Sequence, residues 1–139
     1  MPFPNHPLHH GRHTRAVSWG DVYWFDFGRP LSNQYTVARA RPALVLSDCR
    51  RVLRRTVTVT PLSGLEHRKS GYSFHVPVSA ADYPALDKDS MVKIDQLYCV
   101  NRDDLIDEHY ITTFTPRTMR VVYAQLVSVL YFQGVQSTI

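Results

Sequence analysis

The stretch VARARPALVLSDC, residues 37–49, sets two arginines directly before an apolar run. Four consecutive apolar residues after Pro42 are typical of a buried strand, and a proline fits the first position of such a strand. Arg41 therefore leads into the core of the fold, where a guanidinium needs a partner. Two interpretations are open: a salt bridge to Asp26 or Asp48, and a fixed fork of donors aimed at a phosphate.

The segments that follow alternate between apolar and polar residues, as strands with one buried face do. In residues 56–60 the valines lie on one face and the threonines on the other. Residues 91–100 alternate again, which predicts a single strand there. One face of that strand carries Val92, Ile94, Gln96 and Tyr98. Further strands are expected at 19–27, 42–48, 72–79 and 108–115.

The end of the chain has the signals of one helix. Thr115 is a favourable N-cap, and Pro116 suits the first helical position. An apolar stripe follows at Met119, Val122, Leu126, Val129 and Leu130. We therefore expect a mainly β fold, a small, curved, mostly antiparallel sheet or barrel, with the C-terminal helix lying across it.

The size and composition indicate one domain. The 139 residues, 44% hydrophobic and 20% charged, fit a soluble domain with a modest core. We expect a flexible N-terminal tail at 1–15, one domain at 16–132 and a C-terminal tail at 133–139. No apolar run approaches the roughly 20 residues of a membrane span, and the first residues lack the apolar core of a secretory signal. A cytoplasmic protein with no membrane partner is expected.

Neither the cysteines nor the histidines form a metal-ligand motif. Cys49 and Cys99 lie far apart, which favours small buried thiols over a disulfide framework or a zinc site. The histidines of the N-terminal tail have no acidic or thiolate neighbour to fix a metal geometry. We expect no metal and no cofactor, so an active site must use Arg, Ser, Thr, Gln, His or Glu side chains directly.

The charge of the chain is distributed unevenly. Residues 1–69 hold 11 Lys and Arg against 4 Asp and Glu, whereas residues 70–139 hold 5 against 8. A basic half of this kind favours an anionic partner, most often a nucleic acid.

Four further residues are candidates for chemistry. Ser63 follows a predicted strand, where its hydroxyl either donates to a phosphate or caps a turn. Gln96 lies on an otherwise apolar face, so its amide needs a partner in the fold or in a ligand. Glu66 and His67 lie in a charged loop, and they either move protons near neutral pH or form a solvated loop face.

Taken together, these stretches resemble the MazF/PemK family of toxin endoribonucleases. The matching segments are GDVYWFDFG, LSNQ, RPALVLS, VTVTPLSG, GYSF and LDKDSMVKIDQLYCVNRDDL, followed by a C-terminal helix. They occur in the family order and at the family spacing between Gly20 and Leu130. Each segment alone is weak evidence for the family, whereas the full set in this order is specific to it.

The resemblance implies a fold, an activity and partners. The fold is an SH3-like small barrel of the CcdB/MazF (plasmid maintenance toxin) kind, in a homodimer. The activity is metal-independent, sequence-specific cleavage of single-stranded RNA, as an mRNA interferase toxin, to 2′,3′-cyclic phosphate and 5′-hydroxyl ends. The partners are single-stranded RNA and a cognate antitoxin protein that neutralises the toxin.

The resemblance also assigns roles to residues. The catalytic pair is Arg41 and Ser63, where the family usually has arginine and threonine. The family loop Ser-Glu-Gln appears with an asparagine in place of the glutamate, which removes a carboxylate from the site. Among the predicted RNA-binding residues, the resemblance implies Ser32, Asn33, Gln34 and Gln96. His67 and the basic residues Arg39, Arg68 and Lys69 are predicted from their own chemistry, and Arg39 has no matching family position.

The sequence leaves two alternative functions open. A CcdB-like gyrase-poisoning toxin shares the fold, but that activity depends on a C-terminal aromatic pair, and the chain ends in QSTI. A catalytically weak family member that only binds RNA or an antitoxin is the other alternative. The serine at position 63 and the asparagine at position 33 keep it open.

Overall fold

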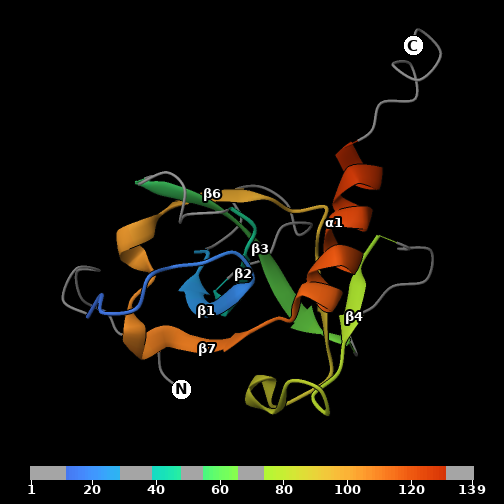
Figure 1. The fold of residues 1–139 in the computed structure, drawn as a ribbon, viewed down its shortest axis with the longest axis horizontal. Coiled ribbons are helices and arrows are strands. Elements are labelled where there is room, and N and C mark those ends of the chain that lie inside the picture. The colour runs from blue at the N-terminus through green and yellow to red at the C-terminus, as the bar shows by residue number, and fades with distance from the viewer. Residues whose placement is uncertain (1–11, 29–38, 48–54, 66–73, 131–139) are drawn as a thin grey trace, which may run out of the picture.

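The computed structural model describes residues 12–28, 39–47, 55–65 and 74–130, which form one curved antiparallel sheet and one α-helix (Figure 1). The strands are β1 (Asp21–Asp26), β2 (Ala40–Val45), β3 (Thr56–Gly64), β4 (Val76–Val78), β5 (Ser90–Val92), β6 (Tyr98–Asn101) and β7 (Tyr110–Thr113). The helix is α1 (Pro116–Leu130), and short 3₁₀ turns are η3 (Pro84–Leu86), η4 (Arg102–Asp104) and η5 (Asp107–His109). The mainly β fold with a C-terminal helix is confirmed.

The strand β3 organises the sheet because it pairs along both of its edges. The strand order is β4-β5-β3-β2-β1-β7, and β6 also pairs with β3. One edge of β3 pairs with β2, from Val59 to Pro61. Along its other edge, the first half of β3 pairs with β6 and the last three residues pair with β5. All these ladders are antiparallel.

The prediction of a single strand over residues 91–100 was wrong. The chain forms β5, leaves the ladder through a turn at residues 93–97, and rejoins β3 as β6. The cause is Pro61 in the facing strand, which has no N–H to offer a neighbouring strand. Its carbonyl still accepts from the Lys93 N–H at 2.9 Å. The break places Gln96 in a turn rather than on the face of a strand.

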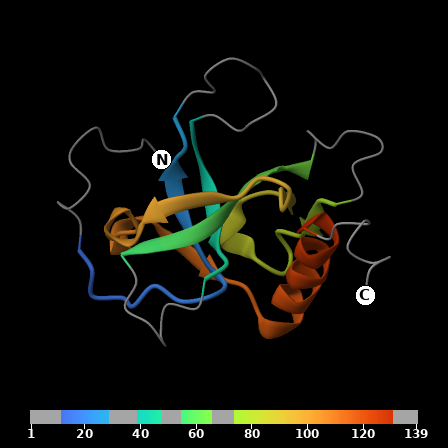
Figure 2. The same cartoon turned by 90° about the horizontal axis from the view of Figure 1, so that it is seen from above.

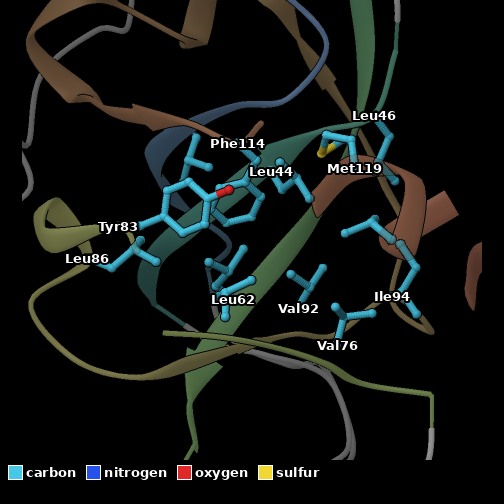
Figure 3. Packing of buried hydrophobic residues seen from close by; sticks show 13 residues of the cluster. Leu44, Leu46, Leu62, Val76, Tyr83, Leu86, Val92, Ile94, Phe114 and Met119 are labelled. Atoms are coloured by element: carbon cyan, nitrogen blue, oxygen red, sulfur yellow. The ribbon is translucent and has the colours of Figure 1, made fainter. Parts of the chain in front are cut away.

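The two faces of the sheet carry two separate apolar clusters. On one face, Val22, Leu44, Leu62 and Val92 pack with Met119 of α1 (Figure 3). On the opposite face, alternate residues of the same strands form a second cluster with residues near η4. Its buried members are Val17, Tyr23, Ala43, Val45, Val57, Val59, Val100 and Leu105. Figure 2 shows α1 and the segment around η4 and η5 on either side of the strands.

The helix begins as its sequence predicts. The Thr118 N–H donates to the Thr115 hydroxyl at 3.2 Å, which is the expected N-cap contact. The hydroxyl of Tyr83 accepts from the Thr115 N–H at 3.1 Å, so a core aromatic holds the same end. Cys99 differs from expectation: it is exposed, because it lies on the outward face of β6.

Residues 12–15 of the N-terminal segment are tied to η5. The Arg12 guanidinium donates to Glu108 at 2.8 Å, and the backbone N–H groups of Thr14 and Arg15 donate to Asp107 at 3.0 Å. Arg15 also lies 3.7 Å from the centre of the Tyr110 ring. These contacts hold the segment that precedes β1 against the end of the sheet.

The attachment of residues 12–15 to η5 depends on the carboxylates of Asp107 and Glu108, so we expect it to be sensitive to acid. The Thr14 hydroxyl lowers the pKa of Asp107, and the Arg12 side chain lowers the pKa of Glu108. A folded-state pKa below the unfolded value gives stabilisation that is present above the unfolded pKa and is lost as pH falls through the folded pKa. The ordinary pKa of a carboxyl group is about 4. We expect residues 12–15 to lose their order, as measured by NMR, when the pH falls below this value.

The variant Asp107→Asn should already loosen these residues at neutral pH and weaken the acid transition. Asp103→Asn, at an exposed position of η4, is the matched control. Residues 12–15 that stay equally ordered from neutral to strongly acidic pH would contradict this attachment.

Candidate functional site

The side chains of Arg41 and Ser63 meet on neighbouring strands. The Arg41 Nη1 donates to the Ser63 Oγ at 3.4 Å. The register explains the contact, because Ala43 of β2 lies opposite Pro61 of β3. Arg41 lies two residues before Ala43 and Ser63 lies two residues after Pro61, so the antiparallel pairing brings them side by side. Ser63 is 7% exposed, and Arg41 is half-buried.

Ser63 lies within the sheet and not at a turn. It pairs with Met91 of β5 while its side chain contacts Arg41 of β2. The turn-cap interpretation is therefore replaced by a strand residue whose backbone is fixed by pairing. Because its oxygen accepts from Arg41, the hydroxyl hydrogen is available to a further acceptor.

The entrance to β2 is held by an irregular pairing with the end of β1. The Phe27 N–H donates to the Arg39 carbonyl at 3.0 Å, and the Arg39 N–H donates to the Gly28 carbonyl at 2.6 Å. Two residues of one strand thus face one residue of the other, as in a β-bulge. Arg39 has φ 68°, a left-handed conformation that L residues adopt at a cost. Phe25 of β1 lies directly opposite Arg41.

Gln96 lies in the 93–97 turn, which several contacts hold in place. Its N–H donates to the Lys93 carbonyl at 2.9 Å, and its Oε1 accepts from the Tyr98 hydroxyl at 3.5 Å. The buried Thr60 hydroxyl donates to the Lys93 carbonyl at 2.8 Å. His75 Nε2 lies 3.0 Å from Asp95 Oδ1, which ties the start of β4 to the same turn.

The remaining predicted RNA-binding residues lie outside the described part of the chain. These are Ser32, Asn33 and Gln34, between β1 and β2, and His67, Arg68 and Lys69, between β3 and β4. Arg39 is the first described residue before β2, and Leu65 is the last described residue after β3. Each lies two residues from a member of the Arg41–Ser63 pair, so both segments join the described fold beside that pair.

A scan against models of protein families matches residues 18–130 to the PemK-like, MazF-like toxin of type II toxin–antitoxin systems. The chain belongs to this family. The match covers the whole sheet and α1, including both members of the Arg41–Ser63 pair. The comparison with curated proteins gave no match.

Solved structures of toxins of the MazF kind have the same fold. One is an endoribonuclease bound to its cognate antitoxin from a mycobacterial species, 24% identical, covering 84% of this chain and 95% of the other, with a TM-score of 0.59. A second is MazF of Deinococcus radiodurans, 20% identical, with coverage of 84% and 97% and a TM-score of 0.65. A third, MazE–MazF of D. radiodurans, is 20% identical, with coverage of 86% and 99% and a TM-score of 0.60.

Sequence reasoning did not select the aromatic row that lies on the same face as this toxin's Arg41–Ser63 pair. The ring centroids of Phe25 and Phe27 are 5.0 Å apart, and those of Phe27 and Tyr98 are 4.8 Å apart. The alternation of Tyr23 and Phe25 in β1 with Phe27 just beyond its end was the available signal, since it places all three on one face.

The structure also has a groove on the helix side of the sheet, with a volume of about 740 Å³. It lies between β4, the segment before β5 and the first turns of α1, and its lining includes Val76, Tyr83 and Val121. Arg41 and Ser63 are not part of it. Within the described ranges, no His, Cys, Asp and Glu side chains gather in a group that could hold a metal, and no helix is long and apolar enough to span a membrane.

The hydrogen bond from Thr60 to Lys93 predicts a stability effect. Thr60→Val keeps the shape of the side chain but leaves the Lys93 carbonyl without this donor, which should cost about 1–3 kcal/mol of unfolding free energy. Thr56→Val, at the exposed start of the same strand, should change it by less than about 0.5 kcal/mol. Urea unfolding of the two variants measures the difference. Equal effects would mean that this bond does not hold the turn.

Proposed function

We propose that this toxin is a metal-independent, sequence-specific endoribonuclease that cleaves single-stranded RNA and is neutralised by a cognate antitoxin. The products would carry 2′,3′-cyclic phosphate and 5′-hydroxyl ends. The observation that carries the proposal is the Arg41–Ser63 hydrogen bond, which places a guanidinium and a hydroxyl side by side on two paired strands. Family membership and the titles of the structural neighbours support it.

The arrangement suits attack by an RNA 2′-hydroxyl on the adjacent phosphate. The 2′-hydroxyl loses its proton as the O2′–P bond forms, and the departing O5′ gains a proton as the P–O5′ bond breaks, so the reaction consumes no proton overall. The nucleophile is already part of the substrate, so the protein has to orient it and stabilise the charge on phosphorus. The Arg41 fork binds the non-bridging oxygens, and the Ser63 hydroxyl adds a second donor.

The serine also bears on the weak-enzyme alternative. Serine lacks the methyl group that restricts the rotation of threonine, so its hydroxyl is less strongly oriented by its own backbone. Here the contact with Arg41 supplies an orientation, and Ser63 is nearly buried. These two features support an active toxin over a protein that only binds RNA.

Removing either donor should stop efficient cleavage. With a long single-stranded RNA in EDTA, we expect Arg41→Ala to abolish cutting and Ser63→Ala to slow it by about 100- to 1,000-fold, as for loss of one preorganised donor. Ser63→Thr, which keeps the hydroxyl, should retain activity. Denaturing gels give the rates, and mapping the RNA ends identifies the cut sequence and the phosphate left on it.

Full activity of Arg41→Ala would overturn the assignment of the arginine. A requirement for magnesium, or products with 5′-phosphate ends, would overturn the proposed reaction as a whole.

We further propose that two copies of the toxin associate through α1. Within the described residues, the helix exposes Val127 and Leu130 at 58% and 59%, and their spacing of three residues places both on one face. Apolar side chains exposed along one helix are a common signature of a protein interface. A charge on this surface should prevent association.

In light scattering coupled to size-exclusion chromatography, the wild-type protein should therefore have the mass of a dimer and Val127→Glu that of a monomer. Thr56→Glu, which adds the same charge at the exposed start of β3, should remain dimeric. Identical masses for wild type and Val127→Glu would exclude α1 as the interface.

A further inference from the structure

We propose that Phe25, Phe27 and Tyr98, here called the aromatic row, form a platform on which bases of single-stranded RNA stack. This inference rests on the proposed function and deepens it, because it names the surface that receives the bases next to the cleaved phosphate. The row is continuous: Phe27 lies 5.0 Å from Phe25 and 4.8 Å from Tyr98, measured between ring centroids.

The curvature of the sheet creates the row. Phe25 belongs to β1 and Tyr98 to β6, and these strands are separated by β2 and β3. Neighbouring strands lie about 4.8 Å apart, so in a flat sheet the two ends of the row would be well beyond contact. Phe27, directly after β1, nevertheless reaches Tyr98 because the sheet bends, and their ring centroids lie 4.8 Å apart.

The row is half-buried, which distinguishes it from the core aromatics. Phe25, Phe27 and Tyr98 pack against the second apolar cluster and retain partial exposure. Tyr23, two residues before Phe25 on the same face, is fully buried. The row therefore begins where the aromatic side chains of β1 emerge from the core. Aromatic rings on an open sheet surface are a recurrent means of stacking unpaired bases.

The groups around the row favour RNA as its occupant. Phe25 lies opposite Arg41, so a base on the row has its phosphate next to a guanidinium. At the other end, the Tyr98 hydroxyl contacts the Gln96 amide, which has donors and an acceptor for a base edge. The basic first half of the chain adds charge complementarity. An apolar protein segment would match neither the guanidinium nor the amide.

The test uses a short single-stranded oligoribonucleotide of mixed sequence with 2′-fluoro sugars, which lacks the attacking hydroxyl and stays intact. Its partner probe has the same backbone without bases. We expect Phe27→Leu and Tyr98→Leu each to weaken binding of the base-bearing probe by about 5- to 150-fold, the equivalent of roughly 1–3 kcal/mol per stacked base. Binding of the abasic probe should not change.

The control variant is Trp24→Leu, an aromatic of β1 whose side chain leaves the strand on the opposite face. It should bind both probes like the wild type. Circular dichroism checks each variant for folding. If a leucine variant does not fold, Phe27→Tyr and Tyr98→Phe retain a ring and should bind like the wild type, whereas Phe27→Met should not.

Two results would overturn the platform: leucine variants that bind the base-bearing probe like the wild type, and equal losses on both probes. The outcome is separable from that of the proposed reaction. RNA cleavage that the leucine variants retain in full would remove the platform and leave the nuclease. Base-dependent binding without cleavage by the wild-type protein would leave the platform and remove the nuclease.

Discussion

The fold depends on one strand, β3, and on the proline inside it. This strand is the shared partner of β2, β5 and β6, so it determines where all three lie. Pro61 has no N–H for the β5–β6 side, and there the chain turns away at residues 93–97 before pairing resumes. The missing donor therefore produces the turn that carries Gln96. Ser63 lies two residues after the proline. The positions of Ser63 and of the turn that carries Gln96 are therefore both determined by β3.

The sequence predicted what local periodicity controls. The alternation of residues 56–60 and the Thr115 cap both appear as expected, because each depends only on neighbouring residues. The break between β5 and β6 was missed, since its cause lies in another strand. The adjacency of Arg41 and Ser63 follows from the β2–β3 register, which family resemblance implied and a single sequence does not reveal.

The aromatic row was missed for a related reason. Alternation places Phe25 and Phe27 on one face, and nothing in the local sequence brings them to Tyr98. That contact depends on how far the sheet bends, which is a property of all the strands between β1 and β6. The two arginines of the opening stretch illustrate the same limit. Both precede β2, but Arg39 occupies a strained bulge position, while Arg41 reaches across the ladder to Ser63.

Alternation along the strands also separates the core beneath α1 from the candidate site. In β2, Leu44 packs into the cluster beneath α1, whereas Arg41 and Ala43 lie on the opposite face. The groove on the helix side belongs to the first face and holds neither Arg41 nor Ser63. The guanidinium and hydroxyl lie beside the aromatic row on the face opposite the groove, so the surface on which we propose that RNA binds is separate from the groove beside α1.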